Sequence, residues 1–124
     1  MNYKISISYV STENAKLNLN YEKLDFSFNS YSDFNSKSWN KHLNKIKVES
    51  NDSDRLIQFY TSFYRSLIHP NLVSDANGQY MGSDFKVYKV KNQRKQYSSF
   101  SVWDTYRTQA QLLAFLFPKQ SSDM

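Results

Sequence analysis

Apolar and polar side chains alternate along the first residues of the chain. Tyr3, Ile5, Ile7 and Tyr9 are each separated by one polar residue. A period of two predicts a β-strand with one buried face and one solvated face. A strand needs a neighbour to pair with, and no equally clear strand follows for dozens of residues. We therefore interpret this segment as a strand of a sheet whose other strands precede it.

A short helical turn and an irregular segment are expected next. Ser11 or Thr12 can cap a turn that runs through Leu17 or Leu19. Residues 20–31 are polar and aromatic without a period, which predicts a linker to the helices that follow.

An amphipathic helix is predicted from about Ser32, and Ser32 or Asp33 can cap its first turn. Trp39, Leu43 and Ile46 recur at intervals of four and three, the spacing of one helix face. Residues 49–53 then break the pattern and mark a candidate domain boundary.

The clearest helix follows this boundary. Its apolar residues form one stripe at intervals of three and four: Leu56, Tyr60, Phe63 and Leu67, widened by Ile57, Tyr64 and Ile68. Residues 52–54 offer side chains that can cap its start and suit the helix dipole. Pro70 is expected to end it, because proline disfavours a helical conformation in the residue before it.

A loop and a hairpin are predicted after Pro70. Asn77 and Gly78 together are a strong turn signal inside the loop. Residues 85–90 can form a strand, and the chain is expected to return near Tyr97.

A second strong helix is predicted over residues 101–117. Its apolar residues fall on one face: Trp103, Tyr106, Ala110, Leu113 and Phe117. Pro118 is expected to end this helix, and residues 120–124 are expected to form a loop.

The composition fits a small domain with an aromatic core. The 124 residues are 40% apolar and 17% aromatic, and no cysteine is present for a disulfide or a thiolate metal site. The first residues lack the apolar run of a signal peptide, and no apolar stretch reaches the roughly 20 residues of a membrane span. On these grounds we expect a soluble, unexported chain with no membrane partner.

The formal net charge of +5 would suit an anionic partner such as nucleic acid. The basic residues come closest to a cluster over residues 86–95, where Tyr88 and Tyr97 could stack on bases. The other charges are scattered, as on solvated faces. We expect no nucleic-acid partner. A single-stranded nucleic-acid binder is kept as the least favoured of the possible functions.

The sequence lacks the common catalytic motifs. It has no glycine-rich phosphate loop and no G-x-S-x-G nucleophile motif, and His42 and His69 lack the spacing of metal ligands. The densest polar and aromatic group is Phe100–Arg107. There the indole of Trp103, which can pack on the apolar face of a sugar ring, stands next to Asp104, whose carboxylate can accept bonds from two hydroxyls. A core tryptophan with a structural Asp–Arg pair would give the same pattern.

Six segments match one enzyme family in the same order along nearly the whole chain. They are Ile7–Leu19, Trp39–Val48, Phe59–Leu67, His69–Leu72, Ser74–Tyr80 and Phe100–Arg107. Phe59–Leu67 reads F-Y-T-S-F-Y-R-S-L and is similar to F-Y-T-A-L-Y-x-S-L, and Phe100–Arg107 reads F-S-V-W-D-T-Y-R and is similar to F-S-L-W-D-T-F-R. The chain resembles glycoside hydrolase family 92, the exo-acting α-mannosidases. It departs from the family at Asn77, commonly Asp, and at Ala110-Gln111, commonly His-Pro.

The resemblance implies an α+β fragment. One or more terminal β-strands of a β-sandwich would be followed by a linker helix, and then by the first helices and a hairpin of an (α/α)6 toroid. Residues 1–19 would end the N-terminal β-sandwich domain, and residues 20–52 would form a linker with a helix. Residues 53–124 would begin the catalytic domain, which is incomplete here.

The resemblance also implies the activity of the parent enzyme. The family implies a Ca²⁺-dependent, inverting exo-α-mannosidase, here expected to be α-1,2-specific, that acts on N-glycan or mannan α-mannosides. Its members are usually secreted, periplasmic or on the cell surface, so the location of this chain stays open. The family's catalytic acid, catalytic base and calcium ligands lie C-terminal to every residue present here. No catalytic or metal residue is therefore assigned, and we expect the chain alone to bind no Ca²⁺ and to be inactive.

The Trp–Asp pair carries over from the family. Trp103 and Asp104 are expected to contact the mannose in the −1 subsite, with Arg107 orienting Asp104. Asp75 and Gly78 shape a loop expected near the site, and turn chemistry explains these two residues equally well. The expected partners are a mannose-containing glycan and the remainder of the catalytic domain. A non-catalytic carbohydrate-binding or interaction module is the alternative function.

Overall fold

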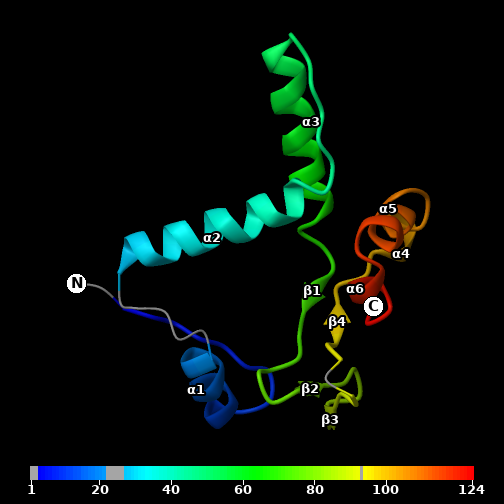
Figure 1. The fold of residues 1–124 in the computed structure, drawn as a ribbon. Helices are drawn as coiled ribbons and strands as arrows, with labels where there is room; N and C mark the ends of the chain where they lie inside the picture. The colour runs from blue at the N-terminus through cyan, green and yellow to red at the C-terminus, as the bar shows by residue number, and fades with distance from the viewer. Residues whose placement is uncertain (1–2, 22–26, 93) are drawn as a thin grey trace. The chain divides into compact units, whose positions relative to one another are not determined.

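The computed structural model describes residues 3–21, 27–92 and 94–124. The chain divides into two compact units, one of Met1–Lys23 with Pro70–Met124 and one of Leu24–His69. The described residues form short helices and short antiparallel strands (Figure 1), which confirms the α+β class. Among the helices of these residues, none is long and apolar enough to cross a bilayer. The domain boundaries expected after residues 19 and 52 remain predictions.

The strand predicted for the N-terminal segment has no pairing partner among the described residues, and its place in a β-sandwich stays a prediction. Residues 3–8 form no strand with any other described residue. The period of two is still visible, but Tyr3, Ile5, Ile7 and Tyr9 are between 68% and 76% exposed while the residues between them are less exposed. The alternation predicted a buried apolar face, and within the described chain no neighbouring strand covers it.

The helix α1 (Thr12–Tyr21) begins as predicted at Ser11, whose Oγ accepts the backbone N–H of Asn14 at 3.1 Å. It is longer than the expected turn. The linker predicted over residues 20–31 is wrong at both ends, because α1 reaches Tyr21 and α2 (Phe28–Leu43) begins at Phe28. The part of that prediction on residues 22–26 lies outside the described residues.

The helix α3 (Ser53–Ser66) confirms the clearest sequence prediction. Asp52 caps it, and its Oδ1 accepts the backbone N–H groups of residues 54 and 55 at 3.1 and 3.2 Å. Phe63, on the predicted stripe, is buried. The helix ends before Pro70, as expected.

The unit Leu24–His69 contains the helices α2 and α3, and hydrogen bonds hold the segment that connects them against α3. The hydroxyl of Tyr60 donates to the carbonyl of Ile46 at 3.3 Å and accepts the N–H of Val48 at 3.2 Å. The ring of Trp39 packs edge-on against the ring of Tyr64, with centroids 4.5 Å apart. These contacts join α2, the connection and α3.

In the other unit, the described strands form two small antiparallel sheets. β2 (Gln79–Met81) pairs with β3 (Val87–Lys89), and β1 (Asn71–Leu72) pairs with β4 (Tyr97–Ser98). The predicted strand over residues 85–90 is confirmed at its centre. The return near Tyr97 pairs with β1 rather than with that strand, so the β2–β3 hairpin is nested between β1 and β4.

The single helix predicted over residues 101–117 is wrong, because two short helices take its place. α4 (Val102–Thr105) and α5 (Gln109–Leu116) are separated by a break at residues 106–108, where the Gln111 side chain donates to the carbonyl of Tyr106 at 2.9 Å. Val102 and Trp103 are exposed, so the first turn lacks the burial that stabilises short helices.

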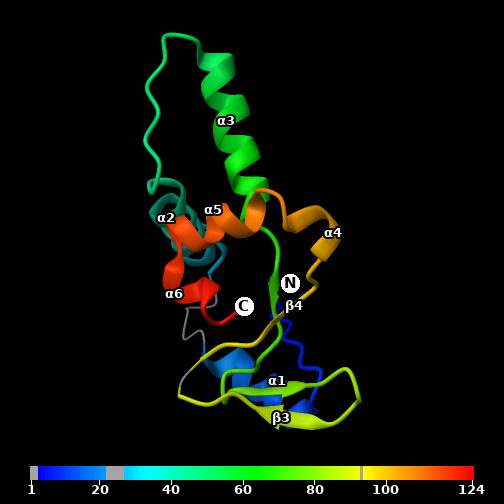
Figure 2. The same ribbon diagram turned by 90° about the vertical axis from the view of Figure 1, so that its right-hand side faces the viewer.

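The C-terminal helices carry the small apolar core of their unit. Leu113, Leu116 and Phe117 are buried there, and Figure 2 shows α5 and α6 (Pro118–Ser121) in contact with one another. Pro118 ends α5 as predicted but also begins α6, where its missing N–H is not needed. The loop predicted over residues 120–124 is therefore partly helical.

Candidate functional site

Trp103 and Asp104 lie in the first turn of α4, and both are exposed to solvent. Trp103 is 86% exposed. The hydroxyl of Ser101 donates to Oδ2 of Asp104 at 2.6 Å, and the backbone N–H of Asp104 donates to the carbonyl of Ser101 at 2.9 Å. Trp103 therefore lies outside the small core of this chain.

Arg107 lies in the break between α4 and α5. Its Nε donates to the hydroxyl of Tyr106 at 2.8 Å, and its guanidinium carbon lies 5.5 Å from the centre of the same ring. The structure therefore holds Arg107 through Tyr106 and the carboxylate of Asp104 through Ser101. Contact of Trp103, Asp104 or Arg107 with a sugar stays a prediction.

Asp75 is a buried carboxylate that binds the N-terminal helix to the loop between β1 and β2. Its Oδ2 accepts the Ser8 hydroxyl at 2.7 Å and the Asn14 amide at 2.8 Å, and its Oδ1 accepts the Asn18 amide at 2.7 Å. Figures 1 and 2 both show α1 beside this loop. Hydrogen bonds to a carboxylate are stronger than those between neutral groups, so Asp75 is a structural anchor.

The residues after Asp75 form a tight turn. The N–H of Gly78 donates to the carbonyl of Asp75 at 2.8 Å, and Gly78 has a positive φ of 82°, which glycine adopts without strain. Asn77 donates to Oδ1 of Asn14 at 3.0 Å and to the side chain of Gln79 at 2.9 Å. Turn and network contacts account for Asp75 and Gly78 in this structure, and their proximity to a sugar stays a prediction.

Sequence reasoning missed the α1 partners of Asp75. Asn14 and Asn18 are four residues apart and therefore share one helix face. That spacing was the only signal for them, because their carboxylate partner lies 61 and 57 residues away along the chain.

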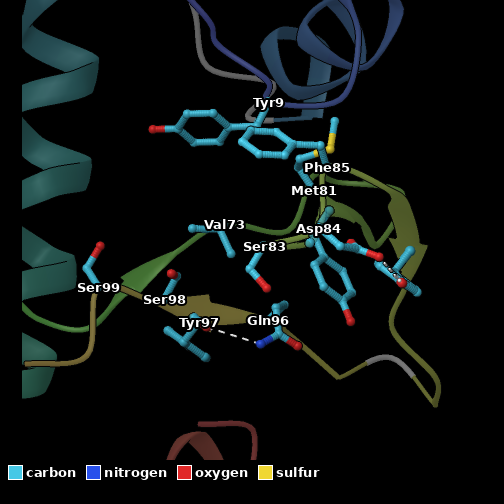
Figure 3. Close-up of a pocket in the computed structure, with 13 residues that line it drawn as sticks. Tyr9, Val73, Met81, Ser83, Asp84, Phe85, Gln96, Tyr97, Ser98 and Ser99 are labelled. Carbon is cyan, nitrogen blue, oxygen red and sulfur yellow. Dashed lines mark hydrogen bonds between the residues drawn. The ribbon is translucent and has the colours of Figure 1, made fainter. Parts of the chain in front are cut away.

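An open pocket of about 940 Å³ lies beside the β2–β3 hairpin. Figure 3 shows Tyr9 and Phe85 together on one side of it, with Gln96, Tyr97 and Ser98 on the other. Sequence reasoning missed this pocket as well, because its lining comes from residues 9, 73, 80–85, 88 and 96–99.

Titratable groups in the pocket are tuned by their neighbours. The Tyr88 hydroxyl donates to Oδ2 of Asp84 at 2.9 Å, which lowers the pKa of that carboxyl and raises the pKa of Tyr88. Burial raises the pKa of Tyr97, and the negative charge of Asp123 adds to this rise. Asp84 is thus held ionised to lower pH than an ordinary carboxylate.

Residues that could hold a metal ion do not gather in the described part of the chain. No three Asp, Glu or His side chains lie together there. Calcium is bound by oxygen ligands, among them carboxylates, and we assign no calcium ligand to the described residues.

Comparison with known proteins identifies the family. The model of the glycosyl hydrolase family 92 catalytic domain matches residues 14–124. The family GH92 α-mannosidase BT3965 from Bacteroides thetaiotaomicron is 31% identical with a TM-score of 0.74, over 86% of this chain and 14% of its own. BT3965 has also been solved in complex with mannoimidazole. The GH92 family glycosyl hydrolase ccman5 is 29% identical with a TM-score of 0.82, over 94% of this chain and 16% of its own.

This chain spans about 14% to 16% of the length of these solved relatives. No curated protein matches it. The match to the family model covers most of the chain, and the fold agrees with two solved members at about 30% identity. The chain therefore belongs to glycoside hydrolase family 92.

Proposed function

We propose that this chain supplies sugar-contacting residues of a Ca²⁺-dependent, inverting exo-α-mannosidase with α-1,2 specificity. The exposure of Trp103 next to the fixed carboxylate of Asp104 carries the proposal. An exposed indole offers a flat apolar surface to a pyranose ring, while the carboxylate accepts hydrogen bonds from its hydroxyls. The complex of BT3965 with mannoimidazole supports a mannose-type ligand, and the natural substrate would be an N-glycan or mannan α-mannoside.

The fold of the parent enzyme is part of the proposal. Residues 3–9 would pair with strands of a β-sandwich, which would cover the exposed row of Tyr3, Ile5, Ile7 and Tyr9. The helices from α3 onward would form the start of an (α/α)6 toroid. The β-sandwich would supply the burial that the side chains of residues 3–9 lack in this chain.

Catalysis would depend on groups elsewhere in the parent enzyme. Inversion needs an acid and a base held about 6.5–9.5 Å apart around a water molecule, and we assign neither to this chain. The contribution of Trp103 and Asp104 would be to bind and orient the mannose, which lowers the barrier by positioning the reacting bond. We assign the calcium ion to the parent enzyme, where it would hold sugar hydroxyls.

A chimeric enzyme tests the proposal. Residues 14–124 of this chain replace the matching region of BT3965, and release of mannose from α-1,2-mannobiose is measured with added calcium. We expect the chimera to be active, Trp103→Ala to lower its kcat/KM by about 10- to 100-fold, and the chain alone to release no mannose. Calcium-dependent release by the chain alone, or a chimera indifferent to Trp103→Ala, would contradict the proposal.

A further inference from the structure

One attachment motif for an asparagine-linked glycan lies in the segment that connects α2 to α3. Asn51, Asp52 and Ser53 read N-x-S, with a residue other than proline at x. No other asparagine of the sequence is followed two positions later by serine or threonine. Glu49 stands two positions before Asn51, where bacterial oligosaccharyltransferases also require an acidic side chain. We propose that Asn51 is an acceptor for asparagine-linked glycosylation in the folded chain.

The backbone around Asn51 leaves the motif accessible. Residues 49–55 are all exposed, and residues 47–52 form neither helix nor strand. The hydroxyl of Ser50 accepts the backbone N–H of Asp52 at 3.1 Å, so Asn51 occupies the middle of a short turn. Figure 2 shows this segment as a loop outside the two helices that it joins. A bulky, hydrophilic glycan is carried by surface positions of this kind.

The polar groups that the enzyme must reach have no competing partner in the described part of the chain. Neither the side-chain amide of Asn51 nor the hydroxyl of Ser53 makes a hydrogen bond to another described residue. The amides of Asn14 and Asn18, by contrast, donate to Asp75 at 2.8 and 2.7 Å. Transfer of a glycan to Asn51 therefore breaks no hydrogen bond of its amide, a loss that would cost free energy.

Two sets of hydrogen bonds hold the motif in place without covering it. Before the motif, the hydroxyl of Tyr60 accepts the N–H of Val48 at 3.2 Å. Within it, Asp52 caps α3 by accepting the backbone N–H groups of residues 54 and 55. Ser53 is the first residue of α3, and the N–H groups of a first turn have no acceptor inside the helix. An enzyme that binds residues 49–53 has only the turn and the cap to open.

The reaction is a group transfer that balances without a redox partner. The donor is an oligosaccharide linked to a polyprenyl diphosphate. The amide nitrogen of Asn51 forms a bond to the anomeric carbon of the first sugar, and the bond from that carbon to the diphosphate oxygen breaks. The polyprenyl diphosphate leaves with the bonding electron pair, and the amide nitrogen loses one proton. The hydroxyl of Ser53 belongs to the motif that the enzyme recognises.

Glycosylation of the purified full chain tests the inference. The folded chain is incubated with a bacterial oligosaccharyltransferase and a polyprenyl-diphosphate-linked oligosaccharide, and the mass of the chain is measured. We expect one glycan per chain, on the tryptic peptide Val48–Arg55. Asn51→Gln and Ser53→Ala should each abolish the mass increase. Glu49→Gln should lower the yield of the glycosylated chain.

Ser50→Ala is the matched control. It removes the hydrogen bond to Asp52 but leaves the motif unchanged, so glycosylation should persist. A peptide of residues 47–55 is treated in the same reaction. A glycan on the peptide but none on the folded chain overturns the inference, and so does the absence of a glycan from both. A glycan that persists in Asn51→Gln also overturns it. Trp103 lies in the other unit, so none of these outcomes bears on the proposed sugar contact.

Discussion

Ser101 holds the carboxylate of Asp104 through a hydrogen bond of 2.6 Å between Oγ and Oδ2. Trp103, the residue before Asp104, lies in the same turn and is 86% exposed. The bond fixes the carboxylate before a sugar binds. Less side-chain entropy is therefore lost when a sugar hydroxyl donates to it. Ser101 is thus a positioning residue for the proposed site.

We predict that Ser101→Ala weakens the binding of methyl α-mannoside about three- to tenfold. The bond to the carboxylate is lost, and hydrogen bonds of this kind contribute about 1 kcal/mol. Calorimetric titration measures the affinity. Ser122→Ala is the control, because the Ser122 hydroxyl donates to the carbonyl of Lys119 at the end of α6, and loss of that bond should leave the affinity unchanged. An unchanged affinity in Ser101→Ala would argue against the positioning role.

We predict that Asp75→Asn destabilises the attachment of α1 by about 3 kcal/mol. The carboxylate oxygens of Asp75 accept hydrogen bonds from Ser8, Asn14 and Asn18. An asparagine side chain would place its NH₂ group, itself a donor, against at least one of these donors. Amide hydrogen exchange of α1 reports the free energy of opening. Asp33→Asn, an exposed position on α2, serves as the control. A change below about 1 kcal/mol in Asp75→Asn would show that the network is not an anchor.

We predict that Asp52→Ala costs about 1 kcal/mol of α3 stability. Asp52 accepts two backbone N–H groups at the start of this helix, and loss of a cap has this typical effect. Hydrogen exchange of the α3 amides measures the change. Asp54→Ala removes the same charge from the first turn of the helix. It should cost only about 0.3 kcal/mol, because only the interaction of the charge with the helix dipole is lost. Equal losses in the two variants would mean that charge, not capping, stabilises the helix start.

The sequence predicted the features that depend on near neighbours. Ser11 and Asp52 cap their helices through residues two or three positions away, and the turn at Gly78 needs only the positive φ that glycine allows. The spacing of three and four between the apolar residues of α3 predicted the helix face on which the buried Phe63 lies. The physical cause of each lies within one or two turns of chain, where sequence patterns are informative.

The features that the sequence could not predict depend on distant partners. Asp75 meets Asn14 across 61 residues, and the pocket brings Tyr9 close to residues 80–99. Periodicity predicted one continuous helix because it assumes that an apolar face is covered, whereas Trp103 is exposed and the helix is broken between α4 and α5. No local pattern encodes these long-range arrangements.

The hydrogen bond between Tyr88 and Asp84 makes the β2–β3 hairpin sensitive to pH in both directions. It lowers the pKa of Asp84, so its stabilisation is present above the ordinary carboxyl pKa of about 3.9 and is lost as pH falls through the lowered value. It raises the pKa of Tyr88, so its stabilisation is present below about pH 10 and is lost as pH rises through the raised value.

Titration of the Asp84 carboxyl carbon by NMR checks this behaviour. We expect Tyr88→Phe to raise the pKa of Asp84 toward its ordinary value, because the donated hydrogen bond is removed. Tyr80→Phe alters the ring opposite Tyr88 but not the donor, and should leave the pKa of Asp84 unchanged. An Asp84 pKa that stays low in Tyr88→Phe would assign the shift to another group.

The most direct test of the proposed sugar contact is the affinity of the chain for methyl α-mannoside, compared between the unchanged chain and Trp103→Ala. Val102→Ala, at the neighbouring exposed position, controls for changes in α4 itself. We predict measurable binding that falls at least about tenfold in Trp103→Ala and is retained in Val102→Ala. Equal affinity in Trp103→Ala and the unchanged chain would contradict the claim that Trp103 contacts the mannose.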